Sequence, residues 1–403
     1  MAKKHFISGL DIGSGTIKIL VVQKKQNQED FEVLSFVEKP SSGIRNGVVI
    51  NPSEVTNIIK EALEETEGQI NQKINSVYLN VAGCHIFSIA SHGLVSVSRV
   101  DQKISNEDVE RVLQAAQTIS LSSNKEILEV LPKEFIIDGE KGIKEVVGLR
   151  GVRLEAEVLA LGGFSPYIKN LTQSVLNSGL EIEDLIFSPL ASCRAVLNKR
   201  EKELGVLVLD IGAKTTGMAV FEQGNLIHLM VLPIGSGHIT NDIAVGLKCD
   251  IDIAEKIKLE FGSVSFQESN KREKIKLSEE ETLVFSRKQL AKIIEPRIIE
   301  IFREVNKELK KVSSQRLLAG GVVLTGGGSK LAKIKELAKK EFRLNCRLGV
   351  PKNFSPAIDD PRLSVVCGLV LTGFDLEGEK PPFSGFGKSL GAKIKKILRI
   401  FLP

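Results

Sequence analysis

The sequence lacks any apolar run long enough to cross a membrane as a helix. Its longest apolar stretch lies around residues 363–374, well short of the roughly 20 residues that a transmembrane helix needs. The beginning of the chain, Met1-Ala-Lys-Lys-His-Phe6, also lacks the apolar core of a signal sequence. These two absences lead us to expect a protein of the cytosol.

Cysteine is scarce and scattered. The 5 cysteines form no CxxC pair, and none lies near a histidine at metal-ligand spacing. An odd number of cysteines without a signal peptide suits a reducing compartment, where disulfides are rare. We therefore expect ordinary buried thiols at all five positions, which are Cys84, Cys193, Cys249, Cys346 and Cys367.

The body of the chain lacks a net charge. The 403 residues include 55 Lys and Arg against 50 Asp and Glu, which gives a net charge of +5. Residues 386–403 contain five basic side chains and no acidic one, so the whole excess lies in this C-terminal segment. A neutral body argues against a nucleic-acid-binding surface.

The overall composition is that of a folded protein of two or three domains. The hydrophobic share is 42% and the charged share is 26%, which argues against disorder, collagen and coiled coil.

One strand–turn–strand pattern occurs twice. Residues 6–22 contain the turn Asp11-Ile-Gly-Ser-Gly-Thr16, and residues 206–221 contain the turn Asp210-Ile-Gly-Ala-Lys-Thr215. A further strand-like run follows each copy, at 31–38 and 226–233. This duplication predicts an α/β protein with two similar lobes and a cleft between them.

Residues 84–163 interrupt the first lobe and predict an inserted α+β subdomain. It has strand-like runs at 87–89, 95–97, 127–137 and 154–161 around one helix at 105–120, which Ser105 and Asp108 open as a capping box. Apolar periodicity predicts the other helices. They are expected at 52–67 with Ser53 as a plausible cap, 167–178, 188–197, 238–247, 252–260, 287–311, 330–341 and 365–375.

The two turns suggest a phosphate site. Small residues let backbone N–H groups approach phosphate oxygens, and a carboxylate at a strand end can hold Mg²⁺ through water. One such turn is weak evidence because Asp and Gly are the usual turn residues. Two equivalent turns, at Asp11 and Asp210, would face each other across the cleft, which favours nucleotide binding.

Three further features fit the same ligand only in combination. Gly326, Gly327 and Gly328 follow an apolar run, where a flat ring could lie against backbone or where a plain connector could form. Residues 233–242 place two glycines and Thr240 at a helix start, with Thr240 as a possible N-cap. Glu255 and Lys258 could meet a ribose, or could be a solvated ion pair.

In this order, the pieces resemble the actin-like ATPase superfamily and, within it, the FtsA family of bacterial cell-division proteins. The resemblance covers essentially the whole chain. The matching motifs are Ser76-Val-Tyr-Leu-Asn-Val-Ala-Gly83, Leu131-Pro-Lys-Glu-Phe135, Gly148-Leu-Arg-Gly-Val152, Asp184-Leu-Ile-Phe-Ser-Pro-Leu-Ala-Ser192, Ile294-Glu-Pro-Arg297 and Gly321-Val-Val-Leu-Thr-Gly-Gly327.

This resemblance implies binding of ATP and Mg²⁺ at matching positions. The implied phosphate-binding residues are Asp11, Gly13, Ser14, Gly15, Thr16, Lys18, Asp210, Gly212, Lys214, Thr215, Thr216, Gly235 and Gly237. Glu255, Lys258, Gly326, Gly327, Gly328 and Ser329 would hold adenosine, and Asp11 and Asp210 would hold Mg²⁺ through water.

The resemblance also implies a division into subdomains. The expected units are 1–83, 164–200 and 366–375 (subdomain 1A), 84–163 (1C), 201–237 and 312–365 (2A), 238–311 (2B), a linker at 376–385, and a C-terminal helix at 386–403. Subdomain 1C would make contacts between protomers and with later division proteins.

Two departures from the superfamily pattern predict weak or absent ATP hydrolysis. Efficient members commonly carry Gln or Glu before the helix that crosses between the lobes, where this chain has Ser188. The second turn also carries Gly217 in place of a second Asp. Without a positioned base the hydrolysis of ATP should be slow.

The C-terminal segment predicts an in-plane membrane anchor. On a helix its bulky apolar side chains share one face and its basic side chains fill the other. The apolar set is Leu390, Ile394, Ile397, Leu398 and Phe401, and the basic set is Lys388, Lys393, Lys395, Lys396 and Arg399. Anionic lipids would be its partner. The alternative is a helix that packs on the protein's own core.

The helix at 287–311 is the expected partner site. Arg287, Lys292, Arg297 and Arg303 lie near Ile294, Ile298 and Ile301 in the sequence. The resemblance implies that basic side chains beside an apolar groove bind the C-terminal peptide of the division protein FtsZ. An ordinary amphipathic helix with a solvated face explains the pattern equally well.

The resulting functional hypothesis is an ATP-binding adaptor that polymerises and tethers FtsZ filaments to the cytoplasmic side of the cell membrane at the division site. One alternative is an actin-like scaffold of the type IV pilus platform, which recognises a short partner peptide. A kinase or chaperone ATPase of the same superfamily is a further alternative.

Overall fold

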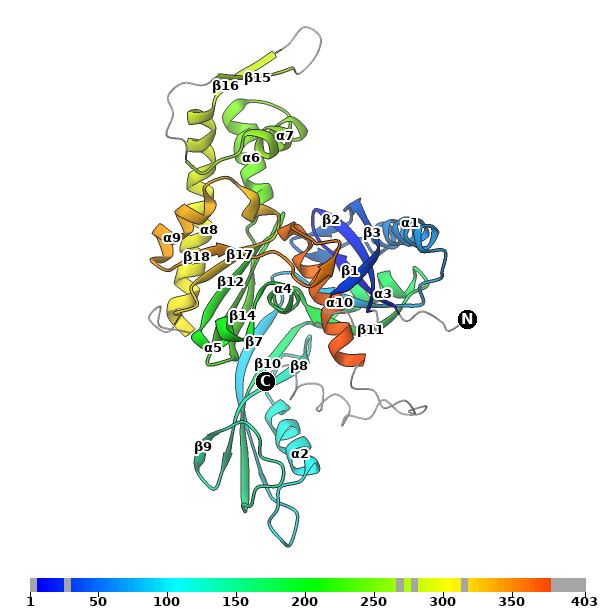
Figure 1. The fold of residues 1–403 in the computed structure, drawn as a ribbon, viewed down its shortest axis with the longest axis vertical. Helices are drawn as coiled ribbons and strands as arrows, with labels where there is room; N and C mark the ends of the chain where they lie inside the picture. The colour runs from blue at the N-terminus through cyan, green and yellow to red at the C-terminus, as the bar shows by residue number, and fades with distance from the viewer. Residues whose placement is uncertain (1–5, 25–29, 266–271, 277–281, 313–317, 378–403) are drawn as a thin grey trace.

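The computed structural model describes residues 6–24, 30–265, 272–276, 282–312 and 318–377 (Figure 1). The expected linker beyond residue 377 and the C-terminal helix 386–403 lie outside these residues. In the described part of the chain, no helix is both long and apolar enough to span a membrane.

The first lobe is built on a six-stranded sheet. Its two central strands form a hairpin, and the next two strands along one side run parallel to β1 and to each other. From edge to edge the strands are β11 (Glu181–Phe187), β6 (Ser76–Val81), β1 (Phe6–Ile12), β2 (Thr16–Lys24), β3 (Phe31–Pro40) and β19 (Phe354–Ser355). A two-stranded sheet of β4 (Ile44–Arg45) and β5 (Val48–Val49) follows β3.

The second lobe repeats this arrangement. Its five-stranded sheet again has an antiparallel meander followed by two parallel strands. The strand order is β14 (Asn225–Leu232), β13 (Thr216–Glu222), β12 (Val206–Ile211), β17 (Val322–Thr325) and β18 (Cys346–Leu348). The predicted duplication into two similar lobes is therefore confirmed.

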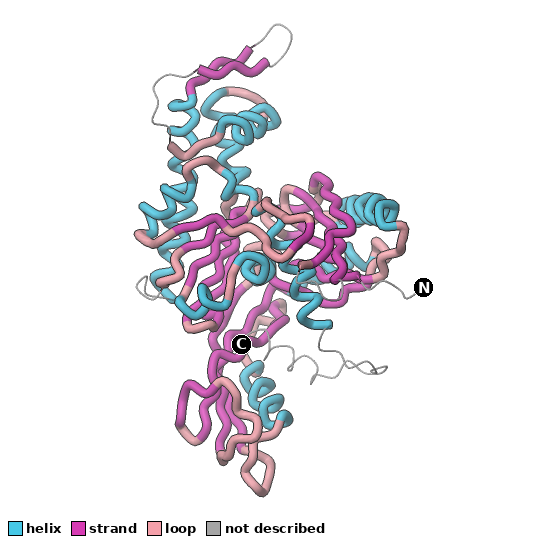
Figure 2. Tube along the Cα trace, in the orientation of Figure 1, coloured by secondary structure: helices cyan, strands magenta, loops and turns pink. Residues whose placement is uncertain are grey.

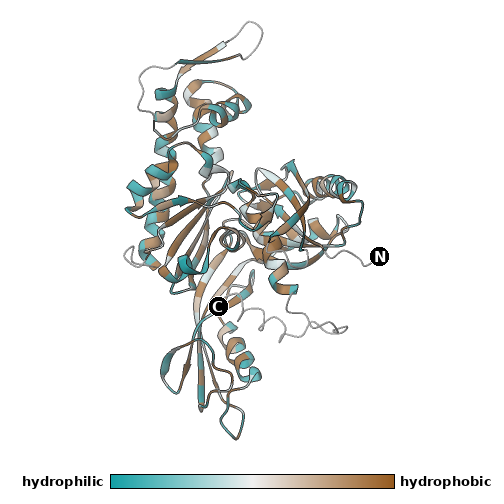
Figure 3. Ribbon diagram, viewed as in Figure 1, coloured by the Kyte–Doolittle hydropathy of each residue, from teal (hydrophilic) through white to brown (hydrophobic). Residues whose placement is uncertain are grey.

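Helices cover both sheets, which explains their continuous apolar strands. In β2, for example, the residues from Ile17 to Gln23 are all buried, as expected of a sheet covered on both faces. Figure 3 shows the apolar strands inside and polar outer helix faces. The first lobe has α1 (Pro52–Ile70), α3 (Ser165–Leu176), α4 (Ser188–Val196) and α10 (Ser364–Glu377); the second has α5 (Lys199–Leu204), α6 (Ser236–Leu247), α7 (Ile251–Phe261), α8 (Arg287–Val312) and α9 (Ile334–Phe342).

Helices α4 and α10 pack against each other where the chain passes between the lobes. A Cβ at Gly368 of α10 would lie 1.7 Å from the carbonyl oxygen of Ala191 in α4, so only glycine allows this approach. Next to it, Arg194 makes a bidentate ion pair with Asp375 at 2.6 and 3.0 Å. The segment that connects the lobes, α4, is thus packed against α10, which in turn packs on β1 of the first sheet.

The inserted subdomain has its own sheet and core. Helix α2 (Asn106–Gln117) packs on one face of a four-stranded sheet (Figure 2). The predicted capping box of Ser105 and Asp108 is present. The strand order is β7 (Phe87–Ser96), β10 (Arg153–Phe164), β8 (Lys125–Ile137) and β9 (Glu140–Ile143). The two predicted short strands in β7 are one strand, because Gly93 lies under α2, where a Cβ would meet the Val112 carbonyl at 2.2 Å.

Several local predictions are wrong. Asn51, not Ser53, caps α1, and α6 begins after Gly235, so Thr240 lies inside that helix. The helix expected from residue 330 begins at Ile334, after a 3₁₀ turn over Gly327–Lys330. Of the five cysteines, only Cys193 and Cys367 are buried; Cys84 is exposed, and Cys249 and Cys346 are half-buried.

The polar stretch after α7 leads into a two-stranded hairpin. Its strands are β15 (Arg272–Lys276) and β16 (Thr282–Ser286), at the end of the second lobe farthest from the inserted subdomain (Figure 1).

Candidate functional site

A cleft of about 360 Å³ lies between the two lobes and is lined by both repeated turns. We call it the interlobe cleft. The predicted site residues that line it are Asp11, Gly13, Ser14, Gly15, Thr16, Lys18, Asp210, Gly212, Thr215, Glu255, Lys258, Gly326 and Gly327. The predicted residues that do not line it are Lys214, Thr216, Gly235, Gly237, Gly328 and Ser329.

The two turns have the same backbone geometry. The Gly13 N–H donates to the Thr16 carbonyl at 3.1 Å, and the Gly212 N–H donates to the Thr215 carbonyl at 2.9 Å. The turns also approach each other closely, because a Cβ at Gly15 would lie 3.0 Å from the Cβ of Ala213. Small residues at both turns thus bring two sets of backbone groups to one cleft.

A buried ion pair lies at the end of the first hairpin. Lys18 Nζ is 3.2 Å from Asp11 Oδ2, and the two residues are direct partners across β1 and β2. Asp11 is 5% exposed and Lys18 is 7% exposed. The lysine therefore compensates the charge of a carboxylate that would otherwise be costly to bury.

The second hairpin has no such lysine. The partner of Asp210 across β12 and β13 is Gly217, and a Cβ there would lie 3.0 Å from Pro189 Cγ of α4. Burial and the negative charge of Asp11 raise the pKa of Asp210 to about 7, an effect that Lys18 only partly offsets. The cleft thus has two carboxylates and one compensating cation at its centre.

Asn80 and Ser188 connect the first sheet to the start of α4. The Asn80 Oδ1 accepts from the Ile12 N–H at 2.7 Å, and its Nδ2 donates to Ser188 Oγ at 3.0 Å. Ser188 in turn donates to the Val81 carbonyl at 3.1 Å. Sequence reasoning assigned no role to Asn80, and its signal was a polar residue within an otherwise apolar strand.

The start of α6 supports the second turn from behind. The Ser236 N–H donates to the Gly212 carbonyl at 2.8 Å, and the Gly237 N–H donates to the Ala213 carbonyl at 2.6 Å. A Cβ at Gly235 would lie 2.6 Å from the same Gly212 oxygen. The helix N-terminus therefore donates to the turn. The hydroxyl of Thr216 is also engaged, because it donates to the Ile234 carbonyl at 2.7 Å.

Glu255 and Lys258 form part of a buried polar cluster. Lys258 Nζ contacts Thr240 Oγ1 at 2.8 Å and Glu255 Oε2 at 2.7 Å, and the Thr240 hydroxyl also donates to Glu255. The Lys258 side chain is only 8% exposed, whereas that of Glu255 is 43% exposed. The alternative of a solvated ion pair is thus wrong for the lysine.

The glycine segment after β17 forms the opposite wall. Gly326 has a positive φ of 79°, and a Cβ there would lie 2.2 Å from Asp210 Oδ1, which requires glycine. Ser329 is buried and does not line the cleft, and its hydroxyl donates to the Gly326 carbonyl at 2.7 Å.

Arg362 also lines the interlobe cleft. It pairs with Asp360 at 2.8 Å and lies 3.5 Å from Glu38 of the first lobe. Sequence reasoning missed both Arg362 and Glu38 as lining residues, because nothing local in the sequence indicates that they meet.

The basic residues of α8 do not lie beside an apolar groove. Ile294, Ile298 and Ile301 are 0% exposed and belong to the core of the second lobe, so that part of the prediction is wrong. Arg297 pairs with Asp242 and Glu300, at 2.7 Å in each contact, and Arg287 pairs with Glu273 at 2.7 Å. Lys292 and Arg303 are exposed.

A shallow basic pocket of about 540 Å³ lies near the C-terminal half of α8. Its lining residues are Arg303, Asn306, Lys307, Lys310, Glu341 and Arg343.

Comparison with solved structures shows the fold. A chain of the solved structure "PilM-PilN type IV pilus biogenesis complex" aligns with a TM-score of 0.64 at 18% identity, over 94% of this chain and 100% of that chain. MreB5 of Spiroplasma citri bound to ADP aligns with a TM-score of 0.54 at 13% identity, over 91% of this chain and 95% of the other. At these identities the likeness is to the actin-like fold alone.

Sequence comparison shows the family. Residues 207–368 match the model "Cell division protein FtsA", and residues 83–161 match "SHS2 domain inserted in FTSA". The chain is 35% identical to the cell division protein FtsA of Pseudomonas aeruginosa, over 95% of this chain and 93% of the relative. It is 32% identical to FtsA of Bacillus subtilis, over 92% and 84% respectively, and 32% identical to FtsA of Escherichia coli K12, over 98% and 97%. The chain therefore belongs to the FtsA family of actin-like cell-division proteins.

Proposed function

We propose that this protein binds ATP with Mg²⁺ in the interlobe cleft and acts as an adaptor that tethers FtsZ filaments to the membrane. The proposal of nucleotide binding rests on the pair of matching turns. The N–H groups of Gly13 and Gly212 donate equivalent backbone hydrogen bonds on opposite sides of one cleft. Such turns present backbone N–H groups to phosphate. An actin-like neighbour, MreB5 of Spiroplasma citri, is bound to ADP.

The residues of the cleft fit Mg²⁺. Among the described residues, no group of three or more acidic, His or Cys side chains could hold a metal ion by itself. Mg²⁺ usually takes one or two carboxylates and completes its shell with water and phosphate. Asp11 and Asp210 supply two carboxylates. Burial and the negative charge of Asp11 raise the pKa of Asp210, and a divalent cation would offset the charge of both.

The turnover of ATP should be slow. Ser188 is the first residue of α4, and its hydroxyl is held between Asn80 and the Val81 carbonyl. A serine in this setting is a poor base for an attacking water. We expect a turnover well below about 1 s⁻¹, the lower end for efficient kinases. A faster rate in a steady-state phosphate-release assay would contradict this, and a sugar-dependent rate would favour the kinase alternative.

The membrane part of the proposal depends on the C-terminal segment. Its five basic residues would each contribute about 1 kcal/mol near an anionic leaflet, so binding should be reversible and sensitive to salt. The protein would then be a peripheral protein of the cytoplasmic side at the division site. Self-assembly into filaments, with the inserted subdomain in contact between protomers and with later division proteins, completes the proposal.

The exposed basic side chains of the second lobe are the proposed contact for the FtsZ peptide. Arg303 lines the basic pocket of α8, and Lys292 is exposed on the same helix. Arg287 and Arg297, which already pair with acidic residues, would contribute less to binding. The affinity for the FtsZ peptide should therefore fall more in a charge-reversed R303E variant than in an R297E variant.

Co-sedimentation with anionic vesicles tests the tether. Full-length protein and a chain that ends at Gly385 are compared in the presence of FtsZ and ATP. We expect that only the full-length protein carries FtsZ down with the vesicles. Lipid binding that survives truncation would overturn the anchor. If the vesicles bind the protein but FtsZ stays in solution, the pilus-type scaffold becomes the better account.

A further inference from the structure

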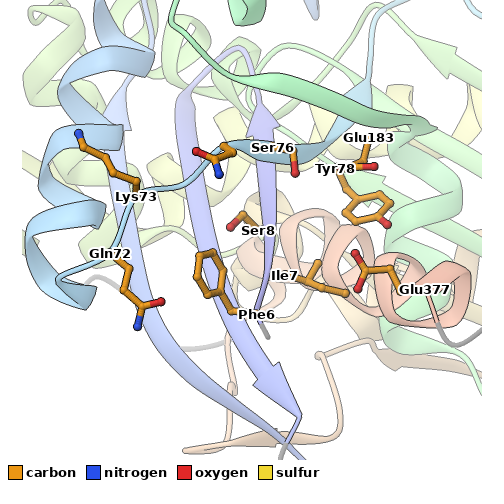
Figure 4. Close-up of a pocket in the computed structure, with 10 residues that line it drawn as sticks. Phe6, Ile7, Ser8, Gln72, Lys73, Ser76, Tyr78, Glu183 and Glu377 are labelled. Carbon is orange, nitrogen blue, oxygen red and sulfur yellow. The ribbon is translucent and has the colours of Figure 1, made fainter. Parts of the chain in front are cut away.

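A second groove, of about 430 Å³, lies on the first lobe at the end of β1 opposite to the interlobe cleft (Figure 4). We call it the β1–β6 groove. It is lined by the beginnings of β1 and β6, the loop before β6, β11 and the end of α10. The lining residues that matter here are Phe6, Ser8, Tyr78, Glu183 and Glu377.

The groove exists because two neighbouring strands separate. The parallel strands β1 and β6 pair only at Gly9 with Tyr78 and at Leu10 with Leu79. β1 nevertheless begins at Phe6 and β6 at Ser76, so within the described part of the chain the first residues of each strand have no strand partner on the side of the groove. Unpaired strand edges of this kind accept extended peptides through backbone hydrogen bonds.

A buried hydroxyl inside the groove also lacks a partner. Ser8 is 3% exposed, and its Oγ has no hydrogen-bond partner among the described residues. Figure 4 shows Ser8 among the lining side chains, between Phe6 and Tyr78. Buried hydroxyl groups normally find a donor or acceptor. The site is therefore built for a ligand that brings polar backbone groups as well as apolar contact.

The charge of the groove favours a cationic ligand. Burial, followed by the negative charges of Glu377 and Glu183, raises the pKa of the Tyr78 phenol. Figure 4 shows both acids beside the Tyr78 ring. Among the described residues of the lining, Lys73 is the one cation, and it already pairs with Glu67 at 2.5 Å. A ligand with basic and apolar side chains would complement the exposed carboxylate of Glu183 and the rings of Phe6 and Tyr78.

We propose that the occupant is the chain's own C-terminal segment, residues 378–403. Glu377, the last described residue, lines the groove, so the segment starts at the site and its effective concentration there is high. From Phe383 to Leu402 the segment contains no proline, so every residue can donate a backbone hydrogen bond. It also contains the basic and apolar side chains that the groove complements.

This docking makes the groove an autoinhibitory site. The apolar residues that would fill the groove are the same ones that the proposed function assigns to lipid, so the docked and membrane-bound forms exclude each other. Anionic membrane then releases the segment by competition. The regulatory consequence rests on the proposed function, whereas the docking itself does not.

Hydrogen exchange on the full chain without lipid tests the docking. In the wild type, the amides of residues 6–8 and 75–78 should exchange at least about threefold more slowly than in an Ile397→Asp/Leu398→Asp variant. A Gln26→Asp/Asn27→Asp variant, which adds the same charge outside the C-terminal segment, should behave as wild type. Equal exchange in all three proteins overturns the proposal. Protection that increases with protein concentration also overturns it, because a second copy would then be the occupant.

Vesicle binding tests the competition. Glu183 is exposed at the rim, and a Glu183→Lys variant should bind vesicles of phosphatidylglycerol and phosphatidylcholine about threefold or more tightly than a Glu140→Lys variant with equal charge. Equal affinities overturn the competition. If no variant binds vesicles, the anchor of the proposed function fails, and the exchange experiment alone decides the docking.

Discussion

Asp11 and Asp210 occupy the same position in the two copies of the hairpin, yet only Asp11 has a lysine opposite it. Lys18 lies 3.2 Å from Asp11, whereas the residue opposite Asp210 is Gly217, and Pro189 of α4 fills the space beside that glycine. The duplication is therefore symmetric in its backbone and asymmetric in its charge. This asymmetry gives the first two predictions.

The stability of the nucleotide-free protein should fall as pH rises toward 7. The pKa of Asp210 is raised from 3.8 to about 7, so the folded state keeps a proton that the unfolded state has lost between these values. This group therefore favours folding most below pH 4 and loses its contribution as pH rises to 7. We expect roughly 1 to 3 kcal/mol less stability at pH 8 than at pH 5 from this residue.

Urea unfolding at several pH values measures this effect. The Asp210→Asn variant cannot ionise and should lose this component of the pH dependence. An unchanged pH profile in the variant would show that another group is responsible.

Removal of Lys18 should destabilise the fold and steepen the same pH dependence. A Lys18→Met variant leaves Asp11 and Asp210 buried without their cation, and breaking a buried pair in this way costs about 3 kcal/mol or more. The pKa of Asp210 should rise further, because Lys18 lowers it. The matched control is Lys60→Met on the exposed face of α1. Equal stability of the two variants would contradict the role of Lys18.

Substitution of Gly368 by alanine should disrupt the packing of α10 on α4. A Cβ would lie 1.7 Å from the Ala191 carbonyl oxygen, so the helices must separate. We expect a loss of about 3 kcal/mol. In α1, Gly68 has no atom within 4 Å of its would-be Cβ, so Gly68→Ala should stabilise the protein by about 0.5 to 1 kcal/mol. Thermal unfolding compares the two, and a similar Tm shift for both would refute this account of the crossing.

Lys258 should affect nucleotide binding more than stability. Its Nζ contacts Thr240 and Glu255 at the wall of the interlobe cleft, where a Lys258→Met variant would remove the cation of the cluster. We expect ATP affinity to fall about tenfold, as for a lost charge-assisted hydrogen bond. Lys256→Met, on the exposed face of the same helix, is the control. Isothermal titration with Mg-ATP gives both affinities, and equal values would remove Lys258 from the site.

Much of the fold could be predicted because its signals are local. The strand–turn–strand repeats around Asp11 and Asp210 and the long apolar periodicity of α8 lie within short stretches of sequence. The capping box of Ser105 was predictable for the same reason. Predictions failed where a distant neighbour decides the conformation. β7 continues through Gly93 because α2 covers it, and α6 begins at Ser236 because its first N–H groups donate to the second turn.

The sequence by itself determined the duplicated lobes, the turns and the location of the excess charge, since each depends on residue type and spacing. Only the tertiary structure decided which polar groups meet. It brings Asn80 to Ser188, joins Arg362 to Glu38, and places Gly235 and Gly237 against the second turn. It also limits the pairing of β1 with β6 to Gly9 with Tyr78 and Leu10 with Leu79. Contacts of this kind join residues far apart in the chain, so no local pattern encodes them.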